Sequence, residues 1–361
     1  MRKDYNTDIT PEVREKMKKN LVYISIFSIV MLFAGFTSGY IVSMGDTFWV
    51  KFPLPTPFWI STAIIICSSL FIQLGITFAK KEKYALSKLF VVLTFVFGVL
   101  FVYFQFKGYG KLIENGSHFT GKNFMTVEGR YGSAGEEGRY DGYYEIKYKG
   151  KFIALDGNDY VINGKKLSKS QFSDVKKFMS QFEKYDFNKK LTISNYGKDY
   201  ILYYKQNELS LINGNLALPD STELQYTDLD RLKKLAINIK DERGDFMMKG
   251  KIGKDFHVYF KGQELEYINR RWGANGKEFK EYLQTKPMET SDVASSYLYI
   301  ITFLHLLHII ATLFYMFKMV RFSLAGKFTK DDTLSLRLGA IFWHFLGILW
   351  IYLLLFLMYI H

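Results

Sequence analysis

Long apolar stretches alternate with charged ones along the chain, and this pattern predicts five helices that cross a membrane. Residues 21–43, 58–79, 89–106, 297–317 and 338–360 contain no Asp, Glu, Lys or Arg. A helix needs about 20 apolar residues to cross a hydrocarbon core of about 30 Å. The first apolar run follows a charged segment and is too long for the core of a cleavable signal, so we expect it to remain as a span.

Residues 124–290 are polar and rich in Gly and Tyr, and they predict a soluble insertion between the third and fourth spans. Asn163-Gly164 and Asn213-Gly214 are typical of the two-residue turns that join hairpin strands. The insertion is therefore predicted to be β-rich.

Three segments of the insertion resemble one another, which predicts a weak internal repeat. They are YYEIKYKGKFIALDG from Tyr143, DYILYYKQNELSLING from Asp199 and DFHVYFKGQELEYIN from Asp255. Each predicts an aromatic-rich strand, a polar turn and a second strand. The Gly-rich segment EGRYGSAGEEGRYDG from Glu128 predicts a flexible loop that leads into the first repeat.

One helix is predicted in this region, over about 168–184, where Phe172, Val175, Met179 and Phe182 recur at helical spacing. The predicted fold is thus an all-α membrane bundle of five transmembrane helices, with an inserted β-rich (α+β) soluble domain between helices three and four.

The formal net charge of +13 is distributed in a way that predicts the orientation of the chain. Lys and Arg gather before the first span, after the second and after the fourth, whereas the short loop on the other side has only Lys51. Basic loops stay in the cytoplasm. We expect a bacterial inner-membrane protein with a cytoplasmic N-terminus and with the insertion and C-terminus in the periplasm. The predicted segments are a cytoplasmic tail at 1–20, helices one to three at 21–123, the extracytoplasmic insertion at 124–290 and helices four and five at 291–361.

The insertion offers few groups that could carry chemistry. Its one histidine is His257, and the only cysteine of the chain, Cys67, lies in the second span, so neither a disulfide nor a cysteine zinc site can form within the chain. GRYGSAGEEG lacks the Lys-Ser/Thr ending of a phosphate-binding loop. A docking or packing role is favoured for the insertion, and we expect no nucleic-acid partner.

Three histidines inside the spans raise the question of haem or metal binding. His305 and His308 lie three residues apart on one helix, and His344 lies in the last span. Three imidazoles can bind a metal, but neutral histidines also form hydrogen bonds between helices. The structural role is favoured over ligation, and we expect no metal or cofactor in this chain.

Small and aromatic residues complete the set that we expect to contact other helices, other subunits or lipid. Small side chains let helices approach closely, and tryptophans seven residues apart share a helix face. The predicted contact residues are Gly35, Ser68, Ser69, His305, His308, Trp343, His344 and Trp350.

The order of these motifs resembles subunit III of the haem-copper cytochrome c oxidases, in its five-helix bacterial form. The similar segments are IFSIVMLFAGFTSGYI, STAIIICSSLF, YFQFKGYGKLIENGSHFTG, YIITFLHLLHIIATL and FWHFLGILWIYLLLFLMY. Together they cover about residues 20–120 and 293–361. The resemblance implies that haem and copper belong to partner subunits I and II and that this chain packs against subunit I. It also implies lipid binding and support of proton uptake and oxygen reduction in aerobic electron transport.

Three positions depart from the family pattern. Ile29 stands where the family often has a membrane-embedded Glu, Gly347 where it has an Asp and Gln73 where it has a His. These departures argue against a direct part in proton handling. The insertion is also unusual, and its predicted side suggests contact with subunit II, cytochrome c or a partner respiratory complex.

Two other functions remain open from the sequence. A cytochrome b-like redox protein would use His305, His308 and His344 as ligands. A membrane-anchored envelope receptor or assembly protein would act through its β-rich insertion.

Overall fold

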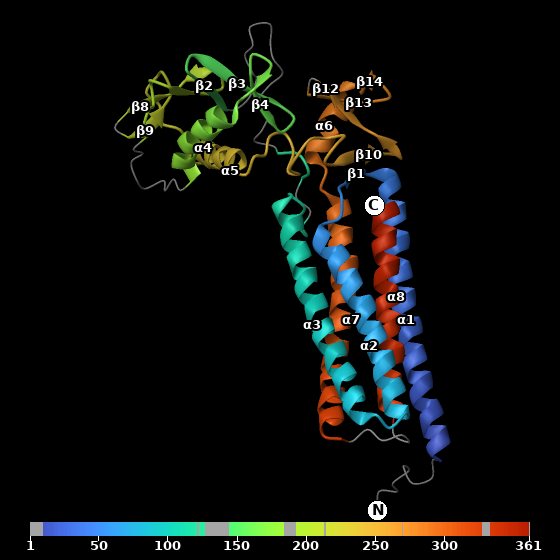
Figure 1. Ribbon diagram of the computed structural model, residues 1–361. Helices are drawn as coiled ribbons and strands as arrows, with labels where there is room; N and C mark the ends of the chain where they lie inside the picture. The colour runs from blue at the N-terminus through green and yellow to red at the C-terminus, as the bar shows by residue number, and fades with distance from the viewer. Residues whose placement is uncertain are drawn as a thin grey trace, which may run out of the picture.

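Five long helices form a bundle, and the β-rich region between the third and fourth of them lies at one end of it (Figure 1). The computed structural model describes residues 10–120, 123–126, 144–183, 193–212, 214–268, 270–326 and 333–360. All five predicted spans are confirmed as apolar helices long enough to cross a membrane. The loop predicted from Glu128 lies outside the described residues. The bundle helices are α1 (Pro11–Asp46), α2 (Thr56–Lys80), α3 (Tyr84–Glu114), α7 (Val293–Leu324) and α8 (Leu334–Tyr359).

The first helix begins earlier than the apolar run that predicts it. Pro11 is the first residue of α1, a position that suits proline because the N–H it lacks would have no helical partner. Half of the segment predicted as a tail is therefore helical. In the bundle, α2 packs closely on α3, α7 packs on α3 and α8, and α1 packs on α7 and α8. Large buried side chains fill the centre, among them Phe58, Phe101 and Trp350.

The predicted β-rich region between α3 and α7 is present, and its described residues form short strands and three helices. Its strands are β2 (Tyr144–Tyr148), β3 (Lys151–Asp156), β4 (Asp159–Ile162), β5 (Lys165–Lys166), β6 (Tyr200–Tyr204), β7 (Asn207–Glu208), β8 (Ser210–Ile212), β9 (Asn215–Ala217), β10 (His257–Phe260), β11 (Gln263–Glu264), β12 (Glu266–Ile268), β13 (Arg271–Ala274) and β14 (Lys277–Glu278). Its helices are α4 (Lys169–Glu183), α5 (Tyr226–Lys240) and α6 (Glu281–Glu289).

Hairpins form at Asn163-Gly164 and beside Gly214, whereas Asn213 lies outside the described residues. Asn163 and Gly164 have φ values of 49° and 72° and join β4 to β5. Gly214, with φ 86°, lies between the paired strands β8 and β9. These positive φ values are the backbone conformation that Asn and Gly tolerate best.

The predicted repeat is also a structural repeat, and each copy ends in a helix. Its first strands are β2, β6 and β10, and its helices are α4, α5 and α6. Each first strand is followed by a turn with two positive φ values, at Lys149-Gly150, Lys205-Gln206 and Lys261-Gly262. The resemblance among the three segments therefore reflects one hairpin-and-helix unit used three times.

The first two repeats pair with each other and form one lobe, here called the two-repeat lobe (residues 144–240). Strands β2 and β6 are antiparallel, and Ile146 lies opposite Leu202, its counterpart in the second repeat. The sheet runs in the order β5-β4-β3-β2-β6-β7. Helices α4 and α5 pack on each other, and the lobe has its own core, separate from that of the bundle.

The third repeat instead pairs with a strand from outside the insertion. Strand β1 (Phe48–Lys51), in the loop between α1 and α2, runs antiparallel to β10, with Phe48 opposite Phe260. The buried residues of this third-repeat lobe (β1 and residues 251–289) form one continuous core with the helix bundle. The third repeat is therefore fixed to the membrane part of the chain.

Asn158 connects the two-repeat lobe to the segment that leads into the third repeat. Its side-chain Oδ1 accepts hydrogen bonds from the backbone N–H groups of Gly244 and Phe246. Its Nδ2 donates to the carbonyl oxygens of Met248 and Gly250, at 2.6 and 2.9 Å. The side-chain amide of Asn158 thus makes all four of its possible hydrogen bonds with one connecting segment.

Candidate functional site in the helix bundle

His305 joins the last two helices. Its imidazole is fully buried, and Nε2 lies 2.9 Å from the carbonyl oxygen of Leu346 on α8. A carbonyl oxygen only accepts hydrogen bonds, so Nε2 carries the proton in this contact. The ring also packs against Trp350 and Phe101, with centroid distances of 5.3 and 6.0 Å.

The other two histidines of the spans lie apart from this contact. His308 Nδ1 lies 2.7 Å from the carbonyl oxygen of Leu304 on its own helix, and its ring faces Phe33 of α1. His344 is half-buried. Among the described residues, no three His, Cys, Asp or Glu side chains gather as a metal site would require. The contact with Leu346 joins α7 to α8, and the contact with Leu304 lies within α7.

Trp343 connects α8 to both α2 and α3 through Ser68. The indole Nε1 donates to Ser68 Oγ at 3.0 Å, and Ser68 Oγ donates to the carbonyl oxygen of Thr94 at 3.1 Å. All three residues are buried. The hydroxyl therefore satisfies a tryptophan N–H that would otherwise have no partner away from water.

Trp350 forms a second connection of the same kind. The sequence predicts Trp350 as a contact residue but not its partner. Its Nε1 donates to Thr62 Oγ1 at 2.8 Å, which joins α8 to α2 again. Nearby, Gln105 Nε2 on α3 donates to Ser61 Oγ at 2.9 Å. The available signal for Thr62, Ser61 and Gln105 was their polarity inside apolar spans, since such side chains form hydrogen bonds between helices.

Glycine permits the closest helix contacts in the bundle. A Cβ built on Gly98 would lie 2.6 Å from Leu313 Cδ2 and 2.8 Å from Trp343 Cη2. On Gly108 it would lie 2.2 Å from Cε1 of Phe58. These positions serve packing within the bundle. Gly35 is different, because it is exposed on α1 and nothing lies within 4 Å of its Cβ position.

Two of the three unusual sequence positions pack inside the bundle, and the third is exposed. Ile29 is buried, and Gln73 is exposed on α2. Gly347 lies against α2, where a Cβ would approach Ser69 Oγ to 3.3 Å. The space that an aspartate would need at 347 is thus partly taken by α2.

The bundle site is therefore a set of buried hydrogen bonds and close contacts that position α8 against α2, α3 and α7. Comparison with known proteins shows what this part is similar to. Residues 275–361, which contain α7 and α8, match the family model of cytochrome c oxidase subunit III. No curated protein matches the chain. Residues 275–361 thus form a subunit III-like domain, and that family is part of a terminal oxidase complex.

Proposed function

We propose that this chain is subunit III of a respiratory haem-copper oxidase, an accessory subunit without a redox centre of its own. In this proposal it packs against subunit I, which with subunit II holds the haem and copper, and it supports oxygen reduction and proton uptake. The observation that carries the proposal is the family match over 275–361. The match covers both helices that contribute His305, Trp343 and Trp350.

The geometry of the histidines supports the non-redox role. The Nε2–H of His305 is directed at the carbonyl oxygen of Leu346, so this nitrogen has no lone pair to offer a metal. His308 Nδ1 is engaged within α7. The first contact holds α7 to α8, and the second lies within α7.

A decisive experiment compares the chain in its complex with the chain alone. The N-terminus is tagged, membranes are extracted in mild detergent, and haem and copper are measured in the purified material. We expect both in near-stoichiometric amounts together with a large partner subunit, and neither in the chain expressed alone. Haem bound by the chain alone, or no haem in either preparation, would contradict the proposal.

The exposed face of α1 around Gly35 is the part of the bundle that we assign to subunit or lipid contact. Gly35 leaves an open position, and Ser28 is exposed seven residues earlier, on the same helix face. Gly35→Leu should lower the amount of partner subunit that co-purifies. Gly45→Leu, on the same helix and equally open, is the matched control. Equal retention in both variants would remove this face from the proposal.

The proposed location is the bacterial inner membrane, with the insertion and C-terminus in the periplasm. Arg14, Lys81, Lys318 and Arg337 belong to helix ends that lie opposite the insertion (Figure 1). Basic residues mark the cytoplasmic side. A cysteine at position 170 (Ser170→Cys) should react with an impermeant maleimide in intact spheroplasts. A cysteine at position 81 (Lys81→Cys) should react only after lysis, and the reverse pattern would overturn the orientation.

The insertion is proposed to contact subunit II, cytochrome c or a partner respiratory complex. A test must leave the third repeat in place, because β10 pairs with β1 and shares the core of the bundle. Residues 144–240 are therefore replaced by a short flexible linker. We expect the oxidase to assemble but to show a higher KM for its electron donor or a smaller share of supercomplex. Unchanged values for both would contradict this role.

A further inference from the structure

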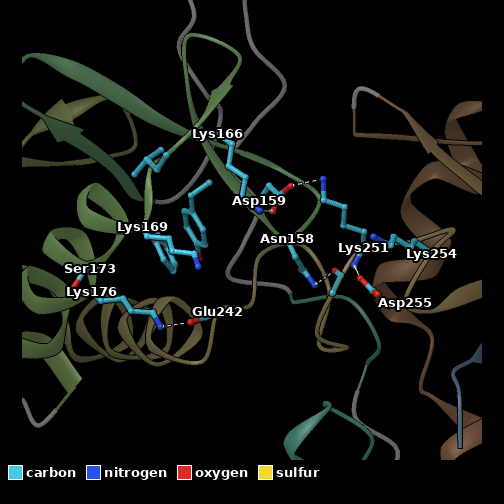
Figure 2. A pocket seen from close by; sticks show the side chains of 14 residues that line it. Asn158, Asp159, Lys166, Lys169, Ser173, Lys176, Glu242, Lys251, Lys254 and Asp255 are labelled. Carbon is cyan, nitrogen blue, oxygen red and sulfur yellow. Dashed lines mark hydrogen bonds and ion pairs between the residues drawn. The ribbon is translucent and has the colours of Figure 1, made fainter.

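A cleft rich in lysine lies where the two-repeat lobe meets the segment leading into the third repeat (Figure 2). We call it the lysine cleft. Its volume is about 620 Å³, within the range of natural ligand sites. One wall comes from β4, β5 and the first half of α4, a second from Glu242 just after α5, and a third from residues 250–255. The first repeat and the segment that joins α5 to β10 thus contribute to one depression.

Positive charge exceeds negative charge in the lysine cleft, because five lysines and three carboxylates line it. The lysines are Lys166, Lys169, Lys176, Lys251 and Lys254. Asp159 pairs with both Lys166 and Lys251, and Glu242 pairs with Lys176 at 2.6 Å. These pairs fix part of the rim and leave a positive excess.

Lys169 and Lys254 are the two lysines of the cleft that lie outside these pairs. Both are exposed, and within the described part of the chain neither lies within ion-pair distance of a carboxylate. Lys169 begins α4, on one side of the cleft, and Lys254 lies in the loop before β10, on the other (Figure 2). A negatively charged guest would therefore meet an available ammonium group on each side.

The floor between these lysines is apolar. The rings of Phe172 and Tyr160 pack with their centroids 5.0 Å apart, and Leu167 is buried beside them. The positively charged groups of the rim are all ammonium groups on flexible stems, with no arginine fork to bind one carboxylate or phosphate at two points. Such a rim suits negative charges spread along an extended guest that also covers an apolar floor.

We propose that the lysine cleft docks an acidic polypeptide segment of a partner protein. The segment would place carboxylates near Lys169 and Lys254 and an apolar side chain over Phe172. An excess of one charge on the rim raises the rate at which an oppositely charged protein arrives and restricts its orientation. This inference goes beyond the proposed function and does not depend on the oxidase assignment, since any partner at this face would meet the same charges.

The test uses the full chain in nanodiscs of zwitterionic lipid and a fluorescein-labelled peptide of ten glutamates as the probe. Fluorescence anisotropy is measured at low and at physiological salt. The variant K169Q/K254Q removes the two available charges, and K151Q/K277Q removes two exposed lysines at strand starts outside the cleft. We expect K169Q/K254Q to raise the Kd about three- to tenfold, the effect of two exposed ion pairs, and the control pair to leave it unchanged.

Charge reversal gives the complementary result. K169E/K254E should bind a ten-lysine peptide more tightly than the native chain does. Equal losses in K169Q/K254Q and K151Q/K277Q, or no binding of the glutamate peptide at low salt, would overturn the proposal. So would a cleft-dependent loss of dextran sulfate binding without a loss of peptide binding, because it would assign the cleft to an anionic polysaccharide.

Discussion

Trp343 Nε1 donates a hydrogen bond to Ser68 Oγ at 3.0 Å, and this contact joins the last helix of the bundle to the second. The same hydroxyl donates to the carbonyl oxygen of Thr94. One serine therefore connects α8, α2 and α3 at a buried point where water cannot replace a lost partner.

Ser68→Ala should destabilise the bundle by about 1–2 kcal/mol, because it leaves the Trp343 N–H buried without an acceptor. Ser69→Ala is the control, since Ser69 is only half-buried and stands against Gly347. Thermal unfolding in detergent, followed by tryptophan fluorescence, measures both. Similar melting temperatures for the two variants would show that the Trp343 contact contributes little.

His305→Ala should weaken the packing of α7 on α8 without changing the haem content of the oxidase. The substitution removes the hydrogen bond to Leu346 and the ring contact with Trp350. We expect less of this chain in the purified complex and an unchanged ratio of haem to subunit I. His344→Ala, at a half-buried position, should change neither quantity. A fall in haem per complex with either variant would favour ligation.

Gly108→Ala should destabilise the chain by about 1–3 kcal/mol through overpacking. The new methyl group would meet Phe58, which is fully buried and packed against Tyr109 and Trp350 and so has little room to turn aside. Gly110→Ala changes the same helix two residues later, where nothing lies within 4 Å. It should be neutral or slightly stabilising. Chemical denaturation in detergent distinguishes the two.

Asn158→Ala should loosen the two-repeat lobe from the third-repeat lobe by removing four hydrogen bonds to one segment. We expect a loss of about 2 kcal/mol, since buried backbone groups lose their partners. Limited proteolysis should then cut within residues 244–250 in the variant well before it cuts the native chain. Asn207→Ala, at an exposed residue of β7, is the control, and equal cleavage rates would contradict the role of Asn158.

Acid should weaken the ion pairs that Asp159 makes with Lys166 and Lys251 in the lysine cleft. Burial opposes ionisation of Asp159, but the hydrogen bonds and charges of Lys166 and Lys251 outweigh it and hold its pKa below the ordinary value. The stabilisation is therefore fully present above the unfolded pKa of about 4 and is lost as pH falls through the lower folded pKa. The melting temperature of the native chain should fall more steeply below pH 4 than that of Asp159→Asn. Parallel pH profiles would exclude this contribution.

The spans and the insertion were predictable because their signals are local. A run of apolar residues specifies a membrane helix, and an Asn-Gly pair specifies a tight hairpin, whatever the rest of the chain does. The helix over 168–184 was predicted for the same reason and is present as α4. Helix α5 was missed, although Leu232, Leu235, Ala236 and Ile239 give it a buried face at helical spacing.

The contacts that hold the parts together could not be predicted in the same way. Nothing near Phe48 indicates that β1 will pair with a strand more than half the chain away. Asn158 reads as an ordinary turn residue until the segment at 244–250 is placed beside it. Trp343, Ser68 and Trp350 were recognised as contact residues, but their partners depend on how three helices pack.

The pairing of β1 with β10 also has a consequence for synthesis. The ribosome synthesises β1 well before its partner β10, because more than half of the chain lies between the two strands. At typical elongation rates, β1 therefore waits on the order of ten seconds or longer for β10 to be made. During that time the two-repeat lobe can emerge and fold, since its core is its own. The third repeat can pair with β1 only once the helices that flank β1 have been inserted. Its folding therefore depends on prior insertion of the first part of the membrane bundle.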